Sequence, residues 1–338
     1  MAICIKIASA MREFSVICIF ILVTTYYVFA QAPSPREVSG VIQTISGIIK
    51  DKYVFPEKGA EISRHLLQEF KSGRFKNVTS WQALDSVVTK VLRDFSNDGH
   101  LFVKYNPTKV QELLAVKKDT SAHSNYDSFF YGEEAVKNNF GFKEVKILGG
   151  NIGYIKLSKI NLSEKSLPVL FASMRFVANT KALIIDIQDN GGGGSSIGDV
   201  FESYFLPKET PLLEFKNREG ENHISKTVSW LIEPKYDKPL YILINNGTVS
   251  AAEAFAFALQ SRNRATIIGQ RSAGAAHMSS WYPVNEHLFV SVSTGAPTLP
   301  GTEVSWERKG VQPDHVVKAG EEIGYVRDLM KRWKKGDD

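Results

Sequence analysis

Residues 240–269 read LYILINNGTVSAAEAFAFALQSRNRATIIG, and this stretch decides the fold class. Leu240–Ile244 is a short apolar run typical of a buried strand, Ala251–Gln260 has the composition of a helix, and Thr266–Gly269 is a second short strand. Two strands joined by a helix can run parallel within one sheet. The stretch therefore indicates an α/β fold.

The same alternation extends upstream. Ala182–Ile187 predicts another buried strand and Ile197–Phe205 a helix. The Gly149-Gly150-Asn151 turn is expected to join Val145–Leu148 to Ile152–Leu157 in a hairpin. We therefore expect a mostly parallel sheet covered by helices.

The segment from Pro35 to Asp98 differs in character. Its apolar residues recur at helical spacing, which predicts a small N-terminal helical bundle. We divide the chain into an N-terminal helical region (31–104), a linker with the first core strand (105–150) and an α/β core (151–338). The helical repeat is carried by Val38, Val41, Ile42, Ile45, Ile48 and Ile49, and by Ala83, Leu84, Val87, Val88, Val91 and Leu92.

Residues 1–30 are typical of a secretory signal peptide. Lys6 and Arg12 precede an apolar run that starts at Phe14, and small residues at Val28 and Ala30 suit a signal peptidase. A retained membrane anchor is the alternative, but the run of about 17 residues is short of the ~20 that a span needs. We expect cleavage near Ala30, no stable membrane span afterwards, and a periplasmic or extracellular protein.

Composition excludes several functions. Both cysteines, Cys4 and Cys18, lie in the leader, so no disulfide or thiolate site is expected after cleavage. The net charge of +5 comes from interspersed charges without an aromatic-basic stripe, which argues against nucleic-acid binding. The histidines are scattered and form no His-Glu-x-x-His motif, so we expect no metal and no cofactor.

Ser250 lies where the quoted strand turns into the following helix. A helix N-terminus presents unpaired N–H groups and the positive end of the helix dipole, which can stabilise an oxyanion. The sequence Ser250-Ala-Ala-Glu253 is also a capping box, in which the serine only caps the helix. From these residues alone, both interpretations remain open.

Four glycines, Gly191–Gly194, follow the strand Ala182–Ile187. Without side chains, their backbone N–H groups can approach a ligand closely. A P-loop is not supported because no Lys followed by Ser or Thr comes after the glycines, and Ser196 stands where a dinucleotide fingerprint needs glycine. A purely structural turn is the remaining alternative.

Together, KALIIDIQDNGGGGS (181–195) and YILINNGTVSAAEAFAFALQSRNRATIIGQRSAGAAH (241–277) resemble the paired signatures of the tail-specific (C-terminal processing) serine peptidase superfamily. The resemblance implies that Ser250 is the nucleophile. It also implies an oxyanion hole formed by the N–H of Ala251 and by N–H groups of the glycine turn, which we assign to Gly192 and Gly193. We assign Gly191, Gly194 and His277 to the substrate cleft.

The branch of the superfamily determines which residue is expected to act as the general base. Residues 269–277, GQRSAGAAH, have alanine where the processing proteases carry a catalytic lysine, so a Ser-Lys dyad is not available. The segment resembles instead the branch that contains the tricorn core protease and the modules of interphotoreceptor retinoid-binding protein. That branch has an Asp-Gly-His-Leu motif, here Asp98–Leu101, and a late "WEGVGVxPD" segment, here Trp306–Asp314.

This resemblance implies that Ser250 attacks, His100 takes and returns the proton, and Glu307 helps to orient the site. The set is chemically reasonable because a serine hydroxyl needs an adjacent base with a pKa near ~7, held in place by a third group. His277 is the alternative base. For Glu307 the alternative is an exposed surface charge pair beside Arg308 and Lys309.

The chain also departs from the family pattern. Gln270 replaces a glutamate, Gln188 replaces an arginine, and Arg308-Lys309 replaces a Gly-Val pair. The first two put the support of the catalytic groups in doubt and leave a noncatalytic descendant as an alternative.

The implied fold is a crotonase-like (ClpP/crotonase) spiral core preceded by the helical bundle. No PDZ domain is expected because residues 102–149 are too few for a strand and a PDZ module. The implied activity is serine-type hydrolysis of a peptide or protein substrate through an acyl-enzyme. A binding module with an apolar pocket is the alternative; export argues against a coenzyme A-dependent enzyme. Oligomer formation is left open.

Overall fold

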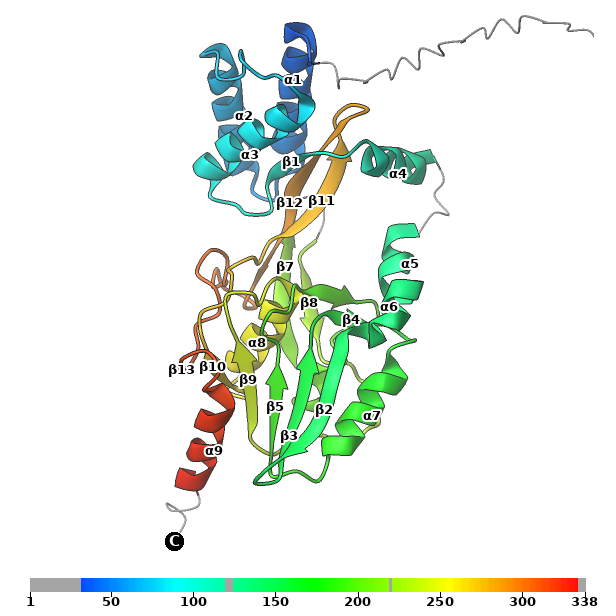
Figure 1. The fold of residues 1–338 in the computed structure, drawn as a ribbon, viewed down its shortest axis with the longest axis vertical. Coiled ribbons are helices and arrows are strands. Elements are labelled where there is room, and N and C mark those ends of the chain that lie inside the picture. Colours follow the sequence, from blue (N-terminus) through cyan, green and yellow to red (C-terminus); the bar gives the residue numbers. More distant parts are fainter. Residues whose placement is uncertain (1–31, 119–123, 219–220, 334–338) are drawn as a thin grey trace, which may run out of the picture. The chain divides into compact units, whose positions relative to one another are not determined.

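The computed structural model describes residues 32–118, 124–218 and 221–333 (Figure 1). The predicted signal peptide, residues 1–30, lies outside the described residues. No helix within the described ranges is both long and apolar enough to cross a membrane.

The predicted N-terminal bundle consists of three helices, α1 (Pro35–Lys52), α2 (Pro56–Lys71) and α3 (Trp81–Ser96). Ser34 caps α1 and Ser80 caps α3, each by accepting a backbone N–H three residues later. The apolar faces predicted from the sequence are buried, with Ile42, Ile45 and Leu84 fully inside. This confirms the helical periodicity.

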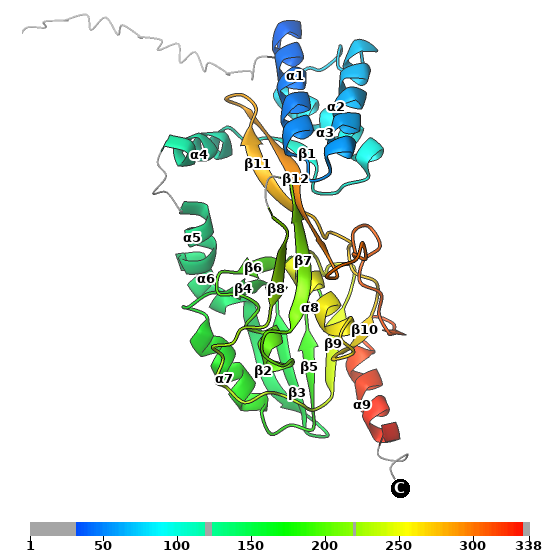
Figure 2. The same cartoon turned by 180° about the vertical axis from the view of Figure 1, so that it is seen from behind.

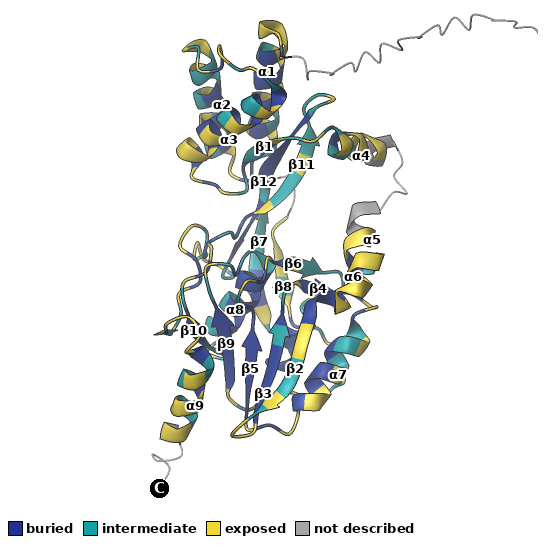
Figure 3. Cartoon of the chain, viewed as in Figure 1, coloured by how far each residue is buried: buried dark blue, intermediate teal, exposed yellow. Residues whose placement is uncertain are grey.

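The α/β core is a six-stranded sheet of order β13-β10-β9-β5-β3-β2. All neighbouring strands are parallel except the β2–β3 hairpin, as the sequence predicts. The central strands β5 and β9 are buried along their whole length, because helices cover both faces (Figure 3). The strands are β2 (Phe142–Leu148), β3 (Ile152–Leu157), β5 (Ala182–Asp186), β9 (Leu240–Ile244), β10 (Thr266–Gly269) and β13 (His315–Val316).

Alternate residues of these strands serve two different cores. One face packs against α7 (Leu167–Val177) and α8 (Ala251–Gln260), and the other packs against α9 (Glu322–Trp333) (Figure 2). Along β5, for example, Leu183 and Ile185 face the first core while Ile184 faces the second. This alternation follows from the period of two in a strand.

A second, antiparallel sheet was not predicted from the sequence. Its long strand β12 (Leu288–Thr298) pairs with β1 (Phe102–Tyr105) over one half and with β7 (Pro211–Asn217) over the other. The remaining strands are β8 (His223–Lys226) on β7 and β11 (Met278–Pro283) on β12. Because β1 directly follows the helices, this sheet links the helical region to the rest of the chain.

The remaining elements lie between these parts. The range 105–150, predicted as a linker with the first core strand, contains β2 and the helices α4 (Pro107–Lys118), α5 (Ser124–Tyr131) and α6 (Glu133–Lys137), with a 3-10 turn η1 (Asn139–Gly141). A short parallel pair, β4 (Ile160–Leu162) and β6 (Gly193–Ser195), incorporates the end of the glycine turn.

The helix predicted over Ile197–Phe205 is wrong. Only a 3-10 turn, η2 (Glu202–Tyr204), forms there. Gly198 has φ +78°, which a right-handed helix does not allow, and its carbonyl accepts the Ser195 hydroxyl at 2.6 Å. Asp199 forms an isolated bridge with Thr227 instead of a helical turn.

Candidate active site

Ser250 has a backbone conformation unlike that of the helix caps elsewhere in the chain. Its φ and ψ are 58° and −121°, whereas the caps Ser34 and Ser80 have extended backbones. A non-glycine residue in this region is strained, and such strain concentrates at functional sites. A strained serine on a strand-to-helix turn is also the geometry that exposes a nucleophilic hydroxyl. The conformation favours the nucleophile over the simple cap.

Glu253 holds this turn in place. Its fully buried carboxylate accepts hydrogen bonds from the Ser250 N–H at 2.8 Å and from the Ser272 hydroxyl at 2.5 Å. It also accepts the backbone N–H groups of Gly274 and Ala275 at 2.6 and 2.9 Å. Glu253 therefore fastens Ser250 to the loop at 272–277 and is more than a capping residue.

The glycine turn packs directly against Ser250. A Cβ on Gly192 would lie 2.8 Å from the Ser250 Cβ and 3.2 Å from the Ala251 N, and Gly192 has φ +82°, so only glycine fits. The turn is fixed by Asn190, whose carbonyl accepts the Val249 N–H at 2.9 Å. Its side chain accepts the Gly192 N–H at 3.0 Å. The predicted donors Ala251 and Gly192 thus lie together, but the Gly192 N–H is already bonded.

The N–H of Gly193 differs from that of Gly192. The Ile160 N–H donates to the Gly192 carbonyl, so Gly192 directs its carbonyl towards β4, and Gly194 is the next residue of the turn that faces this strand. Because successive residues of a strand alternate in direction, the Gly193 N–H points away from β4. Of the two glycines predicted as donors, Gly192 has its N–H bonded to Asn190, whereas that of Gly193 faces away from β4.

His100 lies on the loop between α3 and β1. Its backbone N–H donates to the Asp98 carboxylate at 2.8 Å, and its partly buried ring has an Nδ1 with no hydrogen-bond partner among the described residues. Burial lowers the pKa of His100, although the nearby carboxylates of Asp98, Glu307 and Glu253 oppose this shift. The shift favours the neutral imidazole, which is the form that a general base needs.

Asp98 collects donors from three distant parts of the chain. Its fully buried carboxylate accepts the Tyr53 hydroxyl at 2.9 Å and the Ser293 hydroxyl at 2.7 Å, and its Oδ2 lies 3.0 Å from Nδ1 of His277. Burial alone would raise the pKa of Asp98, but the hydrogen bonds from His277 and Ser293 outweigh it and hold the pKa below its usual range. An ionised Asp98 only accepts, so His277 Nδ1 carries the proton.

The buried ring of His277 is thus held by a carboxylate. Burial would lower its pKa, but the hydrogen bond and charge of Asp98 raise the pKa of His277 above its ordinary value. An imidazole held by a carboxylate through Nδ1 is also the arrangement of a triad base. Both His100 and His277 therefore have a feature expected of the base.

The carboxylate of Glu307 forms no hydrogen bond with Nδ1 of His100. Its Oε2 accepts the backbone N–H groups of Ala276 and His277 at 2.8 and 3.1 Å, and its Oε1 lies 3.9 Å from His277 Nδ1. The neighbouring Arg308 does not pair with Glu307 but donates to the Ser96 carbonyl at 2.7 Å. The late segment thereby contacts both the loop at 272–277 and the end of α3.

These bonds form one connected set. Glu253 links Ser250 to Gly274 and Ala275, Glu307 holds the next two residues of that loop, and His277 reaches Asp98. Asp98 in turn binds the His100 N–H. The structure therefore joins the serine turn to the Asp98–Leu101 motif through the loop at 272–277.

Asp98, His277 and Glu307 could also be considered as metal ligands, because one donor atom of each lies within 4.8 Å of the others. The Asp98 oxygen in this group already receives the Tyr53 and Ser293 hydroxyls as well as His277. The arrangement fits a hydrogen-bonded network better than a cation site.

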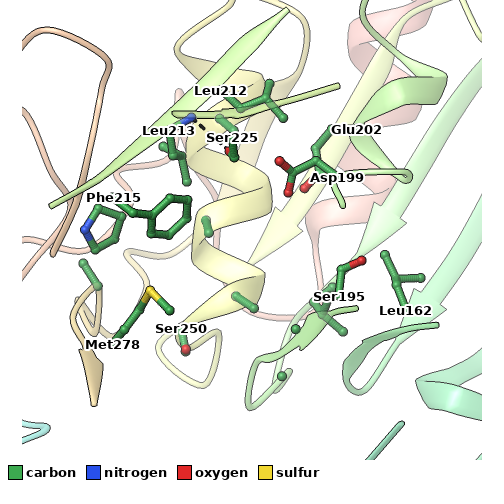
Figure 4. Close-up of a pocket in the computed structure, with 18 of the residues that line it drawn as sticks. Leu162, Ser195, Asp199, Glu202, Leu212, Leu213, Phe215, Ser225, Ser250 and Met278 are labelled. Carbon is green, nitrogen blue, oxygen red and sulfur yellow. Dashed lines mark hydrogen bonds between the residues drawn. The ribbon is translucent and has the colours of Figure 1, made fainter. Parts of the chain in front are cut away.

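A cavity of about 280 Å³ opens beside Ser250 (Figure 4). Gly193 and Gly194 line it, as does Ala251. Gly191 and His277, both assigned to the cleft from the sequence, are not among its lining residues. Gly191 is exposed next to Lys159, and the His277 ring is turned to Asp98, although its neighbours Ala276 and Met278 do line the cavity.

The two glutamines that depart from the family pattern share one partner. Gln188 Nε2 and Gln270 Nε2 donate to the same Glu322 oxygen at 3.0 and 3.1 Å. Glu322 is buried at the start of α9. The glutamines thus fasten the C-terminal helix to the ends of β5 and β10.

Sequence reasoning missed four functional candidates. Asp98 stood inside a recognised motif but was given no role, and Glu253 was considered only as a cap. Asp199 and Glu202 line the cavity and fall in the segment wrongly predicted as a helix. The sequence signal for Asp98 is its place in the Asp98–Leu101 motif.

Comparison with known proteins gives matches over most of the chain. The family model described as "Peptidase family S41" matches residues 151–317. A second model, described as the N-terminal domain of peptidase S41 in eukaryotic IRBP, matches residues 35–137.

Individual relatives agree with these matches. A carboxyl-terminal-processing protease of Picosynechococcus sp. is 28% identical over 178 residues, which cover 53% of this chain and 42% of that protein. The chain thus matches less than half the length of this relative. Among solved structures, a candidate peptidase from Parabacteroides merdae has a TM-score of 0.57 at 19% identity, covering 88% of this chain and 96% of that one. The tricorn protease has a TM-score of 0.53 at 12% identity, covering 87% and 36%. These likenesses show a shared fold.

Proposed function

The chain belongs to peptidase family S41, and on this premise we propose that it is a serine peptidase that hydrolyses peptide bonds through an acyl-enzyme on Ser250. The observation that carries the proposal is the strained Ser250 at the start of α8, packed against the Gly192 turn. A hydroxyl in this position can attack a carbonyl whose oxygen is bound by backbone N–H groups.

The oxyanion would be bound by the N–H groups of Ala251 and Gly193. The Ala251 N–H belongs to the first turn of α8, where helix N–H groups have no intrahelical partner and the dipole favours negative charge. The Gly192 N–H is occupied by Asn190, which supports Gly193 as the second donor. Each such donor typically contributes a factor of about 10²–10³ to kcat.

His100 is proposed as the base that takes the Ser250 proton and returns it to the leaving amine. Its lowered pKa and unbonded Nδ1 support this role. Glu307 would act through the loop at 272–277, which it orients by two backbone bonds. His277 is the second candidate, supported by its hydrogen bond to Asp98.

We extend the proposal to the finer expectations from the sequence. The core would be a crotonase-like spiral, and the protein would act on peptide or protein substrates after export to a periplasmic or extracellular space. The order of the parallel strands and the helices on both faces support the first point.

A fluorophosphonate probe tests the proposed nucleophile. We expect the wild-type protein to be labelled and Ser250→Ala to remain unlabelled. Ser80→Ala is the matched control, because Ser80 is an ordinary helix cap and its loss should leave labelling intact. Labelling of Ser250→Ala would place the nucleophile elsewhere.

A binding module remains the second candidate, supported by the largely apolar lining of the cavity. It predicts that a folded protein is not labelled and releases no product from a peptide library. A single labelling experiment with a thermal-unfolding control therefore separates the two functions.

A further inference from the structure

Two acidic side chains line the cavity beside the proposed nucleophile. Asp199 and Glu202 come from the loop and 3-10 turn that follow the glycine turn. In Figure 4 their side chains lie next to each other, beside α8 and further along it than Ser250. One part of the cavity is thus lined by the proposed nucleophile, and another part is lined by two acidic side chains.

The cavity follows one face of α8. Ala251, Ala254 and Ala258 all line it, at the spacing of successive helical turns. The rise of a helix sets the distance from Ala251 to Ala258 at about 10 Å. Alanine leaves this face of the helix bare, so a long side chain can lie along it.

Apolar side chains form most of the remaining wall. They come from β4, β7, β11 and the late segment, and they include Leu162, Leu212, Leu213, Phe215, Met278 and Trp306. Such a wall suits the carbon stem of a long side chain and leaves its polar end to the two acids.

The two acids face no lysine or arginine in the cavity, although His223 lies close enough to Asp199 to lower its pKa. No Lys or Arg is among the residues that line the cavity, and neither carboxylate forms an ion pair within the described ranges. Burial raises the pKa of both groups, and the charge of Asp199 raises that of Glu202 further. Around Asp199 only the Ser225 hydroxyl and His223 oppose the shift. A partly buried acidic pair of this kind is stabilised by a cation.

We propose that this cavity receives the substrate side chain next to the scissile bond, and that Asp199 and Glu202 make it select lysine or arginine. The inference rests on the proposed peptidase function, because it concerns the side chain of the residue that acylates Ser250. An uncharged long side chain would fill the same space but bring no positive charge to either acid. Charge-assisted hydrogen bonds should therefore give the cationic residue an advantage of about 10- to 100-fold in kcat/KM.

The test uses the full-length protein and tetrapeptide coumarin substrates mixed at every position except the last. That position is lysine, norleucine or alanine, and norleucine keeps the stem of lysine without its charge. We expect wild type to cleave the lysine series about 10- to 100-fold faster than the norleucine series. Asp199→Asn with Glu202→Gln should reduce this ratio to near one, whereas Glu61→Gln, which neutralises an exposed acid on α2, should not change it.

Labelling by a fluorophosphonate separates the possible failures. If wild type is labelled at Ser250 but cleaves norleucine or alanine substrates as well as lysine substrates, the specificity proposal is overturned and the peptidase function stands. Absence of both labelling and cleavage overturns the peptidase function and the specificity together. Equal labelling of the double variant shows that it is folded, so an unchanged lysine preference in that variant also overturns the proposal.

Discussion

Nδ1 of His277 lies 3.0 Å from Oδ2 of Asp98, although 179 positions separate the two residues in the chain. The same carboxylate receives hydroxyls from Tyr53 in the helical region and Ser293 on β12. One ionised group thus connects the helical region, the antiparallel sheet and the loop that holds Ser250. Its removal should affect stability and chemistry together.

Asp98→Asn tests this connection. The variant removes the charge that stabilises protonated His277 Nδ1, so we expect a loss of about 3 kcal/mol in the free energy of unfolding. Urea denaturation measures it. Asp94→Asn, which disrupts an exposed pair with Lys90, is the control and should change stability by less than about 0.5 kcal/mol. A loss no larger than that of the control would contradict the role of Asp98.

The pH dependence of kcat/KM should identify the base. His100 has a lowered pKa, so with His100 as base the acid limb of the profile has its midpoint below the ordinary value of about 6.5. His277 has a raised pKa, so with His277 as base the midpoint lies above that value. We expect the first result for wild type. If the acid limb of His277→Gln has the same midpoint as that of wild type, the assignment of His100 is strengthened. A shifted midpoint would argue for His277 as the base.

Alanine replacement of the two histidines gives an independent comparison. We expect His100→Ala to lower kcat/KM by about 10²–10⁴-fold, the usual contribution of a general base, with a small change in melting temperature. His277→Ala should mainly lower stability, because it leaves Asp98 with one donor fewer. The assignment is wrong if His100→Ala is nearly as active as wild type while His277→Ala is inactive.

The pH dependence of stability follows from the same two histidines, with opposite signs. The raised pKa of His277 stabilises the fold fully below its unfolded value of about 6.5, and this contribution is lost as pH rises through the folded pKa. The unfolding free energy of wild type should therefore exceed that of His277→Gln by more at pH 5.5 than at a pH above the folded pKa. For His100 the lowered pKa gives stability that is present above about 6.5 and lost as pH falls. Urea unfolding of each variant at both pH values checks the two signs.

Gly192→Ala should damage the site without unfolding the protein. A Cβ there would lie 2.8 Å from Ser250 Cβ and from the Val249 carbonyl, and the positive φ adds strain. We expect fluorophosphonate labelling to slow by about 10²-fold or more. Gly149→Ala is the control, because a Cβ at that position has nothing within 4 Å. Equal labelling rates for the two variants would show that the glycine turn does not serve the serine.

Glu322→Ala separates stability from chemistry. It removes the shared acceptor of Gln188 and Gln270 and leaves donors unpaired, which should cost about 2 kcal/mol of unfolding free energy. The labelling rate of Ser250 should remain unchanged, and Glu321→Ala, at an exposed neighbour, should match wild type in both measurements. A slower labelling rate would show that the glutamine contacts support the catalytic groups.

The sequence predicted the parallel core well because its strands are continuous apolar runs. In β5 and β9, polar residues do not alternate with apolar ones, as they would in a strand with one face in solvent. The glycines before Asn151 mark the turn of the β2–β3 hairpin. The long strand β12 was not predicted because it contains Gly295 and Pro297, two residue types that are disfavoured within strands. Its pairing with β1 and β7 is a tertiary effect that no local pattern reports.

The candidate site was predictable in its local parts only. The turn that holds Ser250 and the glycines before Ser195 each have a sequence signal. The contact between Asp98 and His277 depends on two loops meeting across the fold, and neither loop carries a pattern that specifies its partner. The resemblance to a family supplied His100, whereas Asp199 and Glu202 were lost when their segment was taken for a helix.

The donors that meet at Asp98 also determine when the site can form during synthesis of the chain. During synthesis, the helices and then Ser250 leave the ribosome before Ser293 and Glu307 exist. A chain still attached to the ribosome therefore lacks both the hydroxyl from β12 and the carboxylate that fixes the loop at 272–277. The loop beside Ser250 should therefore reach its final arrangement only after residues 293 and 307 have been made.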